Sequence, residues 1–474
     1  MTLQGRRPGD RRVRVEIVQP REYTIAPPKR VKRPRSPAVV LLIGFAVVIA
    51  IGAAILTLPI ASASGEWTRP LDALFTSTSA VCVTGLVVLD TGTHWSPFGH
   101  VVIMALIQIG GFGFMTGSTL LLFLLIGRRT GLSDRMRVQA STGVPELGSV
   151  TTLVRRIAVF TIVAELAGAA ILTVGFLGEG LAAGQAAWWG LFHSISAFNN
   201  AGFDLIGEFR SLTGFADAPW VLAPVGVLIV IGGLGYAIVG DVIGKRGWKR
   251  LALETKLVLA TTVALIIGGT VAIGAFEWTN PQTLGGLPEV QRPLNALFES
   301  VTLRTAGFSA LDTGGLGEAA LFVVMALMFI GGASGSTAGG IKVNTFAILL
   351  VAIVSTARGV PSAEAFGRRI QHILIYRALS VALLSIAIVF IVGLLLELTT
   401  PNASFVQVMF EAISAFGTVG ASTGITADLP DPARLVAIAA MYLGRLGPLT
   451  LVLALTARAR PVRSRPAVET MRIG

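Results

Sequence analysis

The apolar positions of this chain form long uncharged runs that recur from one end to the other. Eight runs are long enough to cross roughly 30 Å of hydrocarbon as helices, at about 1.5 Å per residue. They occupy residues 38–60, 98–126, 157–181, 218–239, 257–276, 319–354, 373–396 and 435–455. We therefore predict an all-α polytopic membrane protein with eight transmembrane helices.

A shorter pattern is repeated between the two runs of each successive pair. Each copy has a phenylalanine and, nine or ten residues later, a glycine. The pairs are Phe75 and Gly85, Phe192 and Gly202, Phe298 and Gly307, and Phe410 and Gly420. About ten helix-compatible residues are too few to cross a bilayer, so each copy is typical of a re-entrant half-helix.

A glycine-rich signature follows each of these glycines by 24 to 30 residues, in the middle of the next run. Its four copies are 109–113, 231–235, 330–334 and 443–447. Two signatures in the same order, four times, indicate four repeats. We place them at residues 38–127, 128–244, 245–354 and 355–456, between a basic disordered cytoplasmic tail at 1–37 and a cytoplasmic tail at 457–474.

Each repeat crosses the membrane twice, so all four copies have the same orientation and pseudo-fourfold symmetry around one pore. Non-helical backbone at membrane depth is tolerated only where it is buried in protein or lines a wet cavity. The loop before each glycine is therefore expected to face the central axis, where backbone carbonyl oxygens replace the water around a cation. The predicted filter residues are Val83, Thr84, Gly85, Asn200, Ala201, Gly202, Thr305, Ala306, Gly307, Thr418, Val419 and Gly420. The alternative is that the four glycines only end short helices.

Charge supports this topology. Of 38 lysines and arginines, 32 fall on one side of the predicted membrane, which places both termini in the cytoplasm by the positive-inside rule. Five fall on the outer side, including Arg304 and Arg434, against 16 acids that would attract cations. The basic residues flank spans without interleaved aromatics, which argues against nucleic-acid binding.

Candidate chemistry for an enzyme is absent from the sequence. The single cysteine, Cys82, excludes a Cys-based zinc site or an iron–sulfur cluster held by this chain alone, and the four histidines show no ligand spacing. Neither paired intramembrane aspartates nor a nucleophile motif occurs. An ion-coupled secondary carrier is the stronger alternative to a pore, although such carriers usually have several ionisable groups in their spans.

The filter motifs resemble those of the Trk/Ktr/HKT superfamily of cation transporters, most closely the bacterial Ktr-type membrane subunit. They are 80–86, 198–203, 304–308 and 416–420. The resemblance implies potassium uptake at the plasma membrane, with K⁺ at the filter as the transported ion and no cofactor bound by this chain. It also implies a homodimer in membrane lipid, regulated by a cytoplasmic nucleotide-binding ring of the KtrA/TrkA type. In that family, a glycine at the position of Gly85 is associated with a preference for potassium. Ala421 is a departure from the family pattern, in which a larger apolar residue is more usual at this position.

The third repeat has five glycines within residues 331–340 at mid-membrane. Each interior glycine costs a helix about 1 kcal/mol relative to alanine, so the helix should break here. The resemblance implies an intramembrane gating loop at 331–342, and the alternative is a kink for close packing. The residues assigned to the gate are Gly331, Gly332, Ser334, Gly335, Ser336, Thr337, Gly339, Gly340 and Arg445.

Arg445 replaces the second glycine of the fourth glycine-rich signature, so symmetry places it near the axis below the filter. A mid-membrane arginine is costly and therefore a functional candidate. We expect an electrostatic barrier to cations, and the alternative is an ion pair with Glu165. Nucleotide sensing is not encoded in this chain. The loops 128–156 and 245–256 and the C-terminal tail are either a docking surface for a partner or ordinary solvated loops.

Overall fold

The computed structural model describes residues 37–127 and 150–447. Its regular secondary structure is helical apart from a two-stranded antiparallel hairpin, β1 (Glu364–Ala365) and β2 (Arg368–Arg369). Its helices, in chain order, are α1 (Pro37–Leu56), α2 (Pro70–Cys82), α3 (Thr91–His94), α4 (Pro97–Gly127), α6 (Val150–Gly178), α7 (Ala183–Phe198), α8 (Pro219–Lys245), α9 (Leu253–Glu277), α10 (Arg292–Thr302), α11 (Glu318–Phe329), α12 (Val343–Ala357), α13 (His372–Thr399), α14 (Phe405–Gly417) and α15 (Asp431–Leu446). The predicted tails and the loop 128–149 lie outside the described residues.

Five of the described helices, α4, α6, α8, α9 and α13, are long and apolar enough to cross a membrane. Helices α1, α11, α12 and α14 have shorter apolar stretches. The predicted run 319–354 is divided into α11 and α12, so the helix breaks where the glycines cluster. The run 435–455 begins in α15 and continues beyond the described residues. Eight complete spans therefore stay a prediction.

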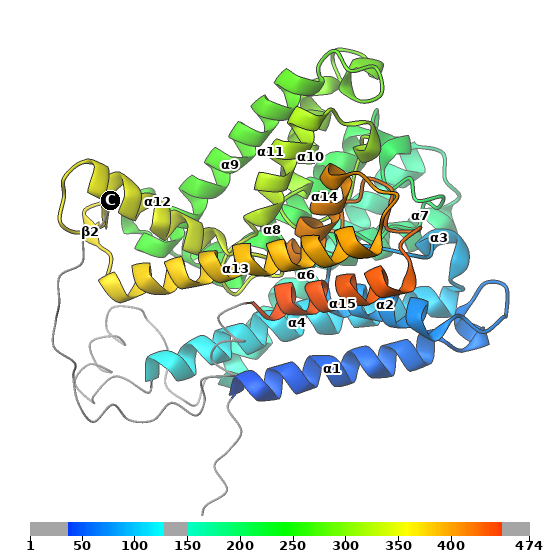
Figure 1. Cartoon of the computed structure of the whole chain (residues 1–474), viewed down its shortest axis with the longest axis horizontal. Helices are drawn as coiled ribbons and strands as arrows, with labels where there is room; N and C mark the ends of the chain where they lie inside the picture. Colours follow the sequence, from blue (N-terminus) through cyan, green and yellow to red (C-terminus); the bar gives the residue numbers. More distant parts are fainter. Residues whose placement is uncertain (1–36, 128–149, 448–474) are drawn as a thin grey trace, which may run out of the picture. The chain divides into compact units, whose positions relative to one another are not determined.

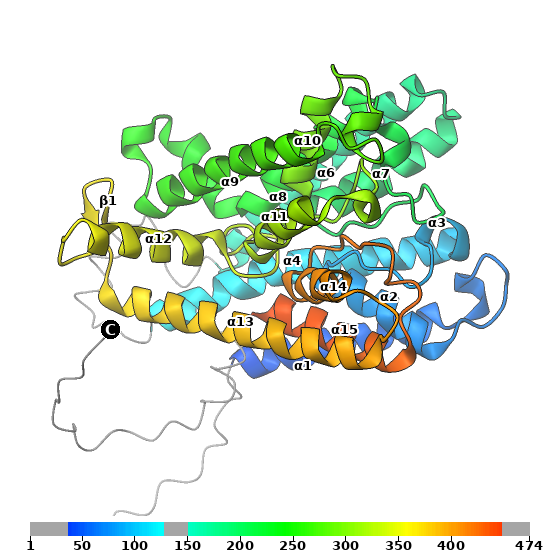
Figure 2. The same ribbon diagram turned by 45° about the horizontal axis from the view of Figure 1, so that its top comes forward.

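Short helices occupy the four places where half-helices were predicted. Helices α2, α7, α10 and α14 each pack against the long helix that precedes them in the chain, as Figures 1 and 2 show. In three copies a serine hydroxyl donates to a carbonyl oxygen of that long helix. The bonds run from Ser77 to Ile49 at 2.8 Å, from Ser194 to Glu165 at 2.6 Å and from Ser300 to Ile266 at 2.8 Å. The fourth copy has Ala412 at this position.

The glycine-rich signature, which follows the filter glycine in each repeat, allows the helix that carries it to approach the end of a short helix closely. A Cβ built on Gly110 would lie 2.0 Å from the carbonyl oxygen of Val81, the penultimate residue of α2. Gly232 and Gly444 make the same close approach to the carbonyls of Phe198 and Phe416, both at 1.8 Å. Only glycine permits such contacts, so this signature fixes helix packing around the predicted filter.

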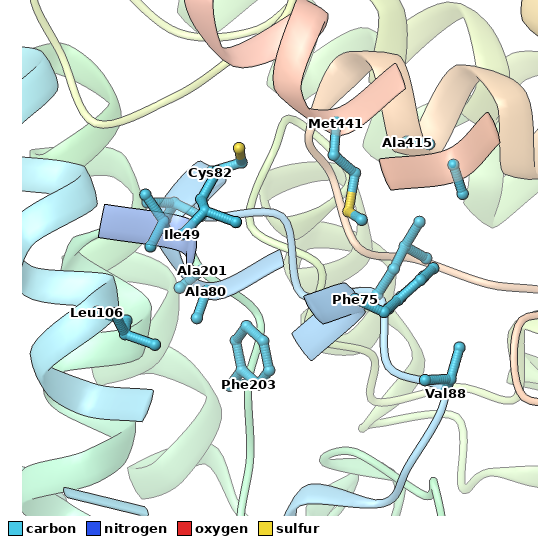
Figure 3. Packing of buried hydrophobic residues seen from close by; sticks show 14 of the residues in the cluster. Ile49, Phe75, Ala80, Cys82, Val88, Leu106, Ala201, Phe203, Ala415 and Met441 are labelled. Carbon is cyan, nitrogen blue, oxygen red and sulfur yellow. The ribbon is translucent and has the colours of Figure 1, made fainter. Parts of the chain in front are cut away.

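The core around the first short helix contains residues from three of the predicted repeats. Figure 3 shows Met441 of the fourth repeat beside Phe75, and Phe203 of the second repeat beside Ala80. Cys82 is a free, buried thiol. Residues distant in sequence are therefore packed into one unit around α2.

Arg434 and Asp72 join α15 to α2 through a buried ion pair, with side chains 13% and 7% exposed. We expect Arg434→Ala to cost about 3–5 kcal/mol in unfolding free energy, because it leaves a buried carboxylate unpaired. The matched control is Arg69→Ala, since Arg69 pairs with Asp431 at 2.9 Å with both side chains more than half exposed. Loss of an exposed pair costs at most about 1 kcal/mol. Thermal unfolding in detergent measures both, and equal effects would contradict the prediction.

Candidate ion filter and gate

The four predicted filter segments meet at the base of a single cavity of about 670 Å³. Its lining includes one glycine from each segment, Gly85, Gly202, Gly307 and Gly420. These residues are separated by more than three hundred positions in the sequence. The structure therefore brings all four segments together, as the sequence predicted.

Each segment has the same unusual backbone. The first residue and the glycine both have positive φ, whereas the residue between them does not. The positive values are 56° and 95° for Val83 and Gly85, 58° and 71° for Asn200 and Gly202, 83° and 77° for Thr305 and Gly307, and 49° and 93° for Thr418 and Gly420. Positive φ is strained for valine, asparagine and threonine, so the surrounding structure must hold these conformations in place.

Amides of the filter segments bond back to the short helices. The middle residues donate their N–H groups to carbonyls near the helix ends, and these bonds are Thr84 to Ser79 at 2.8 Å, Ala201 to Ser196 at 2.8 Å, Ala306 to Thr302 at 2.8 Å and Val419 to Ser414 at 2.9 Å. Among the described residues, no donor reaches the carbonyl oxygens of these four middle residues. Those oxygens are therefore free to act as ligands.

The segments form a closed ring, each touching the next. A Cβ built on Gly85 would lie 2.5 Å from the carbonyl oxygen of Ala201. The corresponding contacts are Gly202 to Ala306 at 2.6 Å, Gly307 to Val419 at 2.2 Å and Gly420 to Thr84 at 2.2 Å. Every filter glycine thus faces the free carbonyl of the following segment, and the fourth returns to the first. A ring of backbone carbonyls is the arrangement that replaces the hydration shell of a monovalent cation.

Two buried glutamates form hydrogen bonds with the segments that follow the filter glycines. From the sequence they were predicted only to belong to the 16 acids of the outer side. Glu299 Oε1 accepts from the backbone N–H of Ala310 at 2.7 Å and of Leu311 at 3.1 Å. Glu411 Oε2 accepts from the hydroxyl of Thr426 at 2.8 Å. Each glutamate directly follows the phenylalanine of its repeat, and that shared position could have indicated a common role.

Few of the 16 acids predicted for the outer side line the cavity. Glu299 and Glu411 are buried and hydrogen-bonded, whereas the acids that line the cavity are Asp90, Asp204 and Asp312. Arg304 was also expected on the outer side, but its side chain is buried, with its guanidinium 3.5 Å from the Thr262 carbonyl. It lies two residues beyond the end of α10, where a helix C-terminus favours a cation.

The glycine-rich loop between α11 and α12 lies against the filter segments. The Thr337 hydroxyl donates to Asn200 Oδ1 at 2.9 Å, and a Cβ on Gly339 would meet the Thr418 hydroxyl. Gly331 donates its N–H to Ile341 at 2.8 Å, which closes the base of the loop. Among the predicted gate residues of this loop, only Ser334 is exposed and Gly335 is half-buried. The loop therefore contacts the first residue of two filter segments directly.

Arg445 is fully buried and bridges this loop to another repeat. Its guanidinium donates to the carbonyl of Thr337 and, at 3.1 Å, to the carbonyl of Gly110 in α4. Glu165, the alternative partner, bonds instead to the side chains of Asn199 and Gln108. Arg445 is thus held by backbone carbonyls and forms no ion pair with Glu165.

Sequence reasoning missed two neighbours of Arg445. Lys342, at the end of the loop, donates to the carbonyl of Ala338, and its Nζ lies 4.9 Å from the centre of the Phe114 ring. The Arg445 guanidinium lies 4.6 Å from the same ring. Both cations therefore contact one aromatic side chain, an arrangement that lowers the cost of burying them. No pattern in the sequence pointed to Phe114.

Comparison with known proteins gives the family of this chain. Residues 34–460 match the model of the TrkH family, described as a cation transport protein. The chain belongs to this family. It is 42% identical to the Ktr system potassium uptake protein B of Bacillus subtilis (strain 168) over 421 residues, covering 88% of this chain and 92% of that protein. It is 40% identical to the potassium/sodium uptake protein NtpJ of Enterococcus hirae, covering 91% and 95% of the two chains.

A solved structure has the same fold. The potassium transporter TrkH from Vibrio parahaemolyticus superposes with a TM-score of 0.70 at 18% identity, covering 91% of this chain and 86% of that one. This TrkH-family chain is accordingly a mostly helical, membrane-embedded transporter and not an enzyme. The family resemblance inferred from the filter motifs is confirmed.

Proposed function

We propose that this chain takes up potassium across the plasma membrane through the ring of filter carbonyls. The closed contact of each filter glycine with the next segment's free carbonyl carries the proposal. Backbone oxygens at fixed positions favour a dehydrated monovalent cation, and the outer acids raise the local cation concentration. The names of the relatives in Bacillus and Enterococcus, one with potassium alone and one with sodium as well, support this substrate class.

The architecture that we propose has four repeats, each a span, a half-helix with its filter segment and a second span, around one pore. Eight spans would place both termini in the cytoplasm, in line with the 32 basic residues on that side. The boundaries are those predicted from the sequence, and the four short helices at equivalent places support them. The loop 331–342 and Arg445 would form the gate below the filter.

Partners are part of the same proposal. We infer a homodimer, as the family resemblance implies. We also infer regulation by a separate cytoplasmic nucleotide-binding ring, because no nucleotide-binding motif occurs in this chain and a relative is named as one component of a Ktr system. Of the proposed docking segments, residues 245–256 and residues 150–156 at the start of α6 are described. An ion-coupled carrier built on the same filter is the second candidate, and the family match does not distinguish the two.

Flux into proteoliposomes of the purified protein tests the function. We expect similar rates for potassium and rubidium, and a lower rate for sodium, because we propose that the filter carbonyls replace the hydration shell of potassium as in potassium channels. Equal sodium and potassium rates would remove the selectivity and leave a cation pore. Uptake of potassium against its own gradient, driven by a proton or sodium gradient, would support the coupled carrier.

External pH should modulate uptake through Asp204. Burial raises the pKa of this carboxyl to about 6, partly offset by the backbone N–H groups of Ile206 and Gly207, which stabilise its ionised form. A raised pKa means that the charge is present above about pH 6 and lost below it. We expect uptake at low potassium to fall about two- to fivefold between about pH 7.5 and 5.5. Asp204→Asn should remove this pH step, and an unchanged step would contradict the assignment.

A further inference from the structure

A buried carboxylate lies behind the second filter segment. Glu165 of α6 is only 6% exposed, and its Oε1 accepts from Asn199 Nδ2 at 2.9 Å. Its Oε2 accepts from Gln108 Nε2 of α4 at 3.2 Å, and Asn199 also donates to Gln108 Oε1 at 3.0 Å. The three side chains form a closed triangle, called here the filter clamp. Asn199 directly precedes the filter segment 200–202.

The filter clamp depends on Glu165 because nothing else compensates its charge. No described cation pairs with Glu165, and Arg445 is bound to carbonyls elsewhere. A buried carboxylate is costly unless hydrogen bonds satisfy it, so Glu165 requires the two amides to stay in place. The same requirement fixes Asn199 and the start of the filter segment.

The other repeats show that packing alone does not demand a carboxylate here. The serine bonds of the short helices place Glu165 at the position of Ile49 in the first repeat and Ile266 in the third. Isoleucine fills that position in both. The filter clamp is therefore an addition confined to the second segment.

The second segment is also hydrogen-bonded to the glycine-rich loop 331–342, which contacts the fourth segment as well. The Thr337 hydroxyl donates to Asn200 Oδ1 at 2.9 Å, one residue after the clamped Asn199. In addition, Gln108 lies two residues from Gly110, whose carbonyl accepts from Arg445. The second segment is thus bonded to the glycine-rich loop through Asn200 and to α4 and α6 through Asn199.

We propose that Glu165 is a positioning residue that sets the preference for potassium over sodium by fixing the second filter segment through Asn199. Glu165 does not touch the ion. Selectivity requires carbonyls that do not close around a smaller ion, and the filter clamp resists that movement at one segment of the ring. The inference rests on the proposed potassium filter.

A charge relocation tests the filter clamp. Asn199→Asp places two carboxylates within hydrogen-bond distance, and we expect it to lower the potassium-to-sodium flux ratio in proteoliposomes about tenfold. The double variant Glu165→Gln with Asn199→Asp restores one amide and one carboxylate in exchanged places. It should recover the ratio to within about twofold of the unmodified protein. Failure of the double variant to recover would overturn the proposal.

Two further variants keep the test decisive. If the Asn199→Asp protein does not insert into the membrane, Gln108→Leu is tested in its place. Gln108→Leu removes the hydrogen bond of Gln108 to Glu165 and its hydrogen bond to Asn199. We expect Gln108→Leu to lower the potassium-to-sodium flux ratio about fivefold, and an unchanged flux ratio in folded protein would overturn the proposal. Leu166→Ala, at a side chain 59% exposed next to Glu165, is the control that should leave the ratio unchanged. Equal sodium and potassium flux in the unmodified protein would instead remove the proposed potassium selectivity on which this inference rests.

Discussion

Gly85→Ser is expected to reduce potassium flux about a hundredfold and to raise the fraction of the remaining cation flux that is carried by sodium. A Cβ at this position would lie 2.5 Å from the carbonyl oxygen of Ala201, and the φ of 95° is strained for any residue with a side chain. The neighbouring carbonyl must move, and a displacement of about 1 Å at a functional site costs on the order of a hundredfold. Initial rates of potassium and sodium uptake in proteoliposomes measure both effects.

Gly274→Ala is the control for this substitution. Gly274 lies in α9, and a Cβ there would meet no atom within 4 Å. Replacing a helical glycine in open space should leave transport unchanged and stabilise the protein slightly. Wild-type flux and selectivity in Gly85→Ser would show that the glycine only ends a helix, the alternative that the sequence left open.

Deleting residues 334–338 should raise resting cation leak by at least about tenfold. The deletion removes Thr337, which bonds to Asn200 and to Arg445, and thereby releases the contact between the loop and the filter. Electrophysiology or flux without any regulatory partner measures the leak. Gly274→Ala is again the control, because it lies in α9, outside the proposed gate, and an added Cβ would meet no atom within 4 Å. Unchanged transport in the deletion would defeat the gate assignment.

Arg445→Ala separates an electrostatic barrier from a structural role at the same gate. A cation below the filter repels potassium, so its removal should raise flux while the protein remains folded. Since Arg445 and Glu165 have different partners, a double-mutant cycle on stability should give no coupling between them beyond about 0.5 kcal/mol. Strong coupling would restore the ion-pair interpretation.

The meeting of the four segments was predictable because their backbone conformation requires a particular residue type. Positive φ and close approach require glycine at the third position of every segment, so Gly85 and Gly420 mark the ring without any knowledge of tertiary contacts. The break between α11 and α12 was predictable for a related reason, since closely spaced glycines disfavour a continuous helix.

Partners of buried charges were not predictable in the same way. Glu165 and Arg445 are the two isolated charges at mid-span, which made a pair between them plausible, but each reaches different groups once the helices pack. Arg304 was assigned to the outer side because hydropathy does not indicate how deeply a residue beside a half-helix is buried, and its side chain is in fact buried. The role of Phe114 depends on contacts between α4, α12 and α15 that no local pattern encodes.

Anomalous diffraction from crystals soaked in rubidium tests the central claim most directly. We expect peaks on the axis enclosed by the four filter segments, at the level of the carbonyl oxygens of Thr84, Ala201, Ala306 and Val419, and their loss in Gly85→Ser. Rubidium peaks elsewhere in the protein, with none inside this ring while uptake persists, would contradict the account.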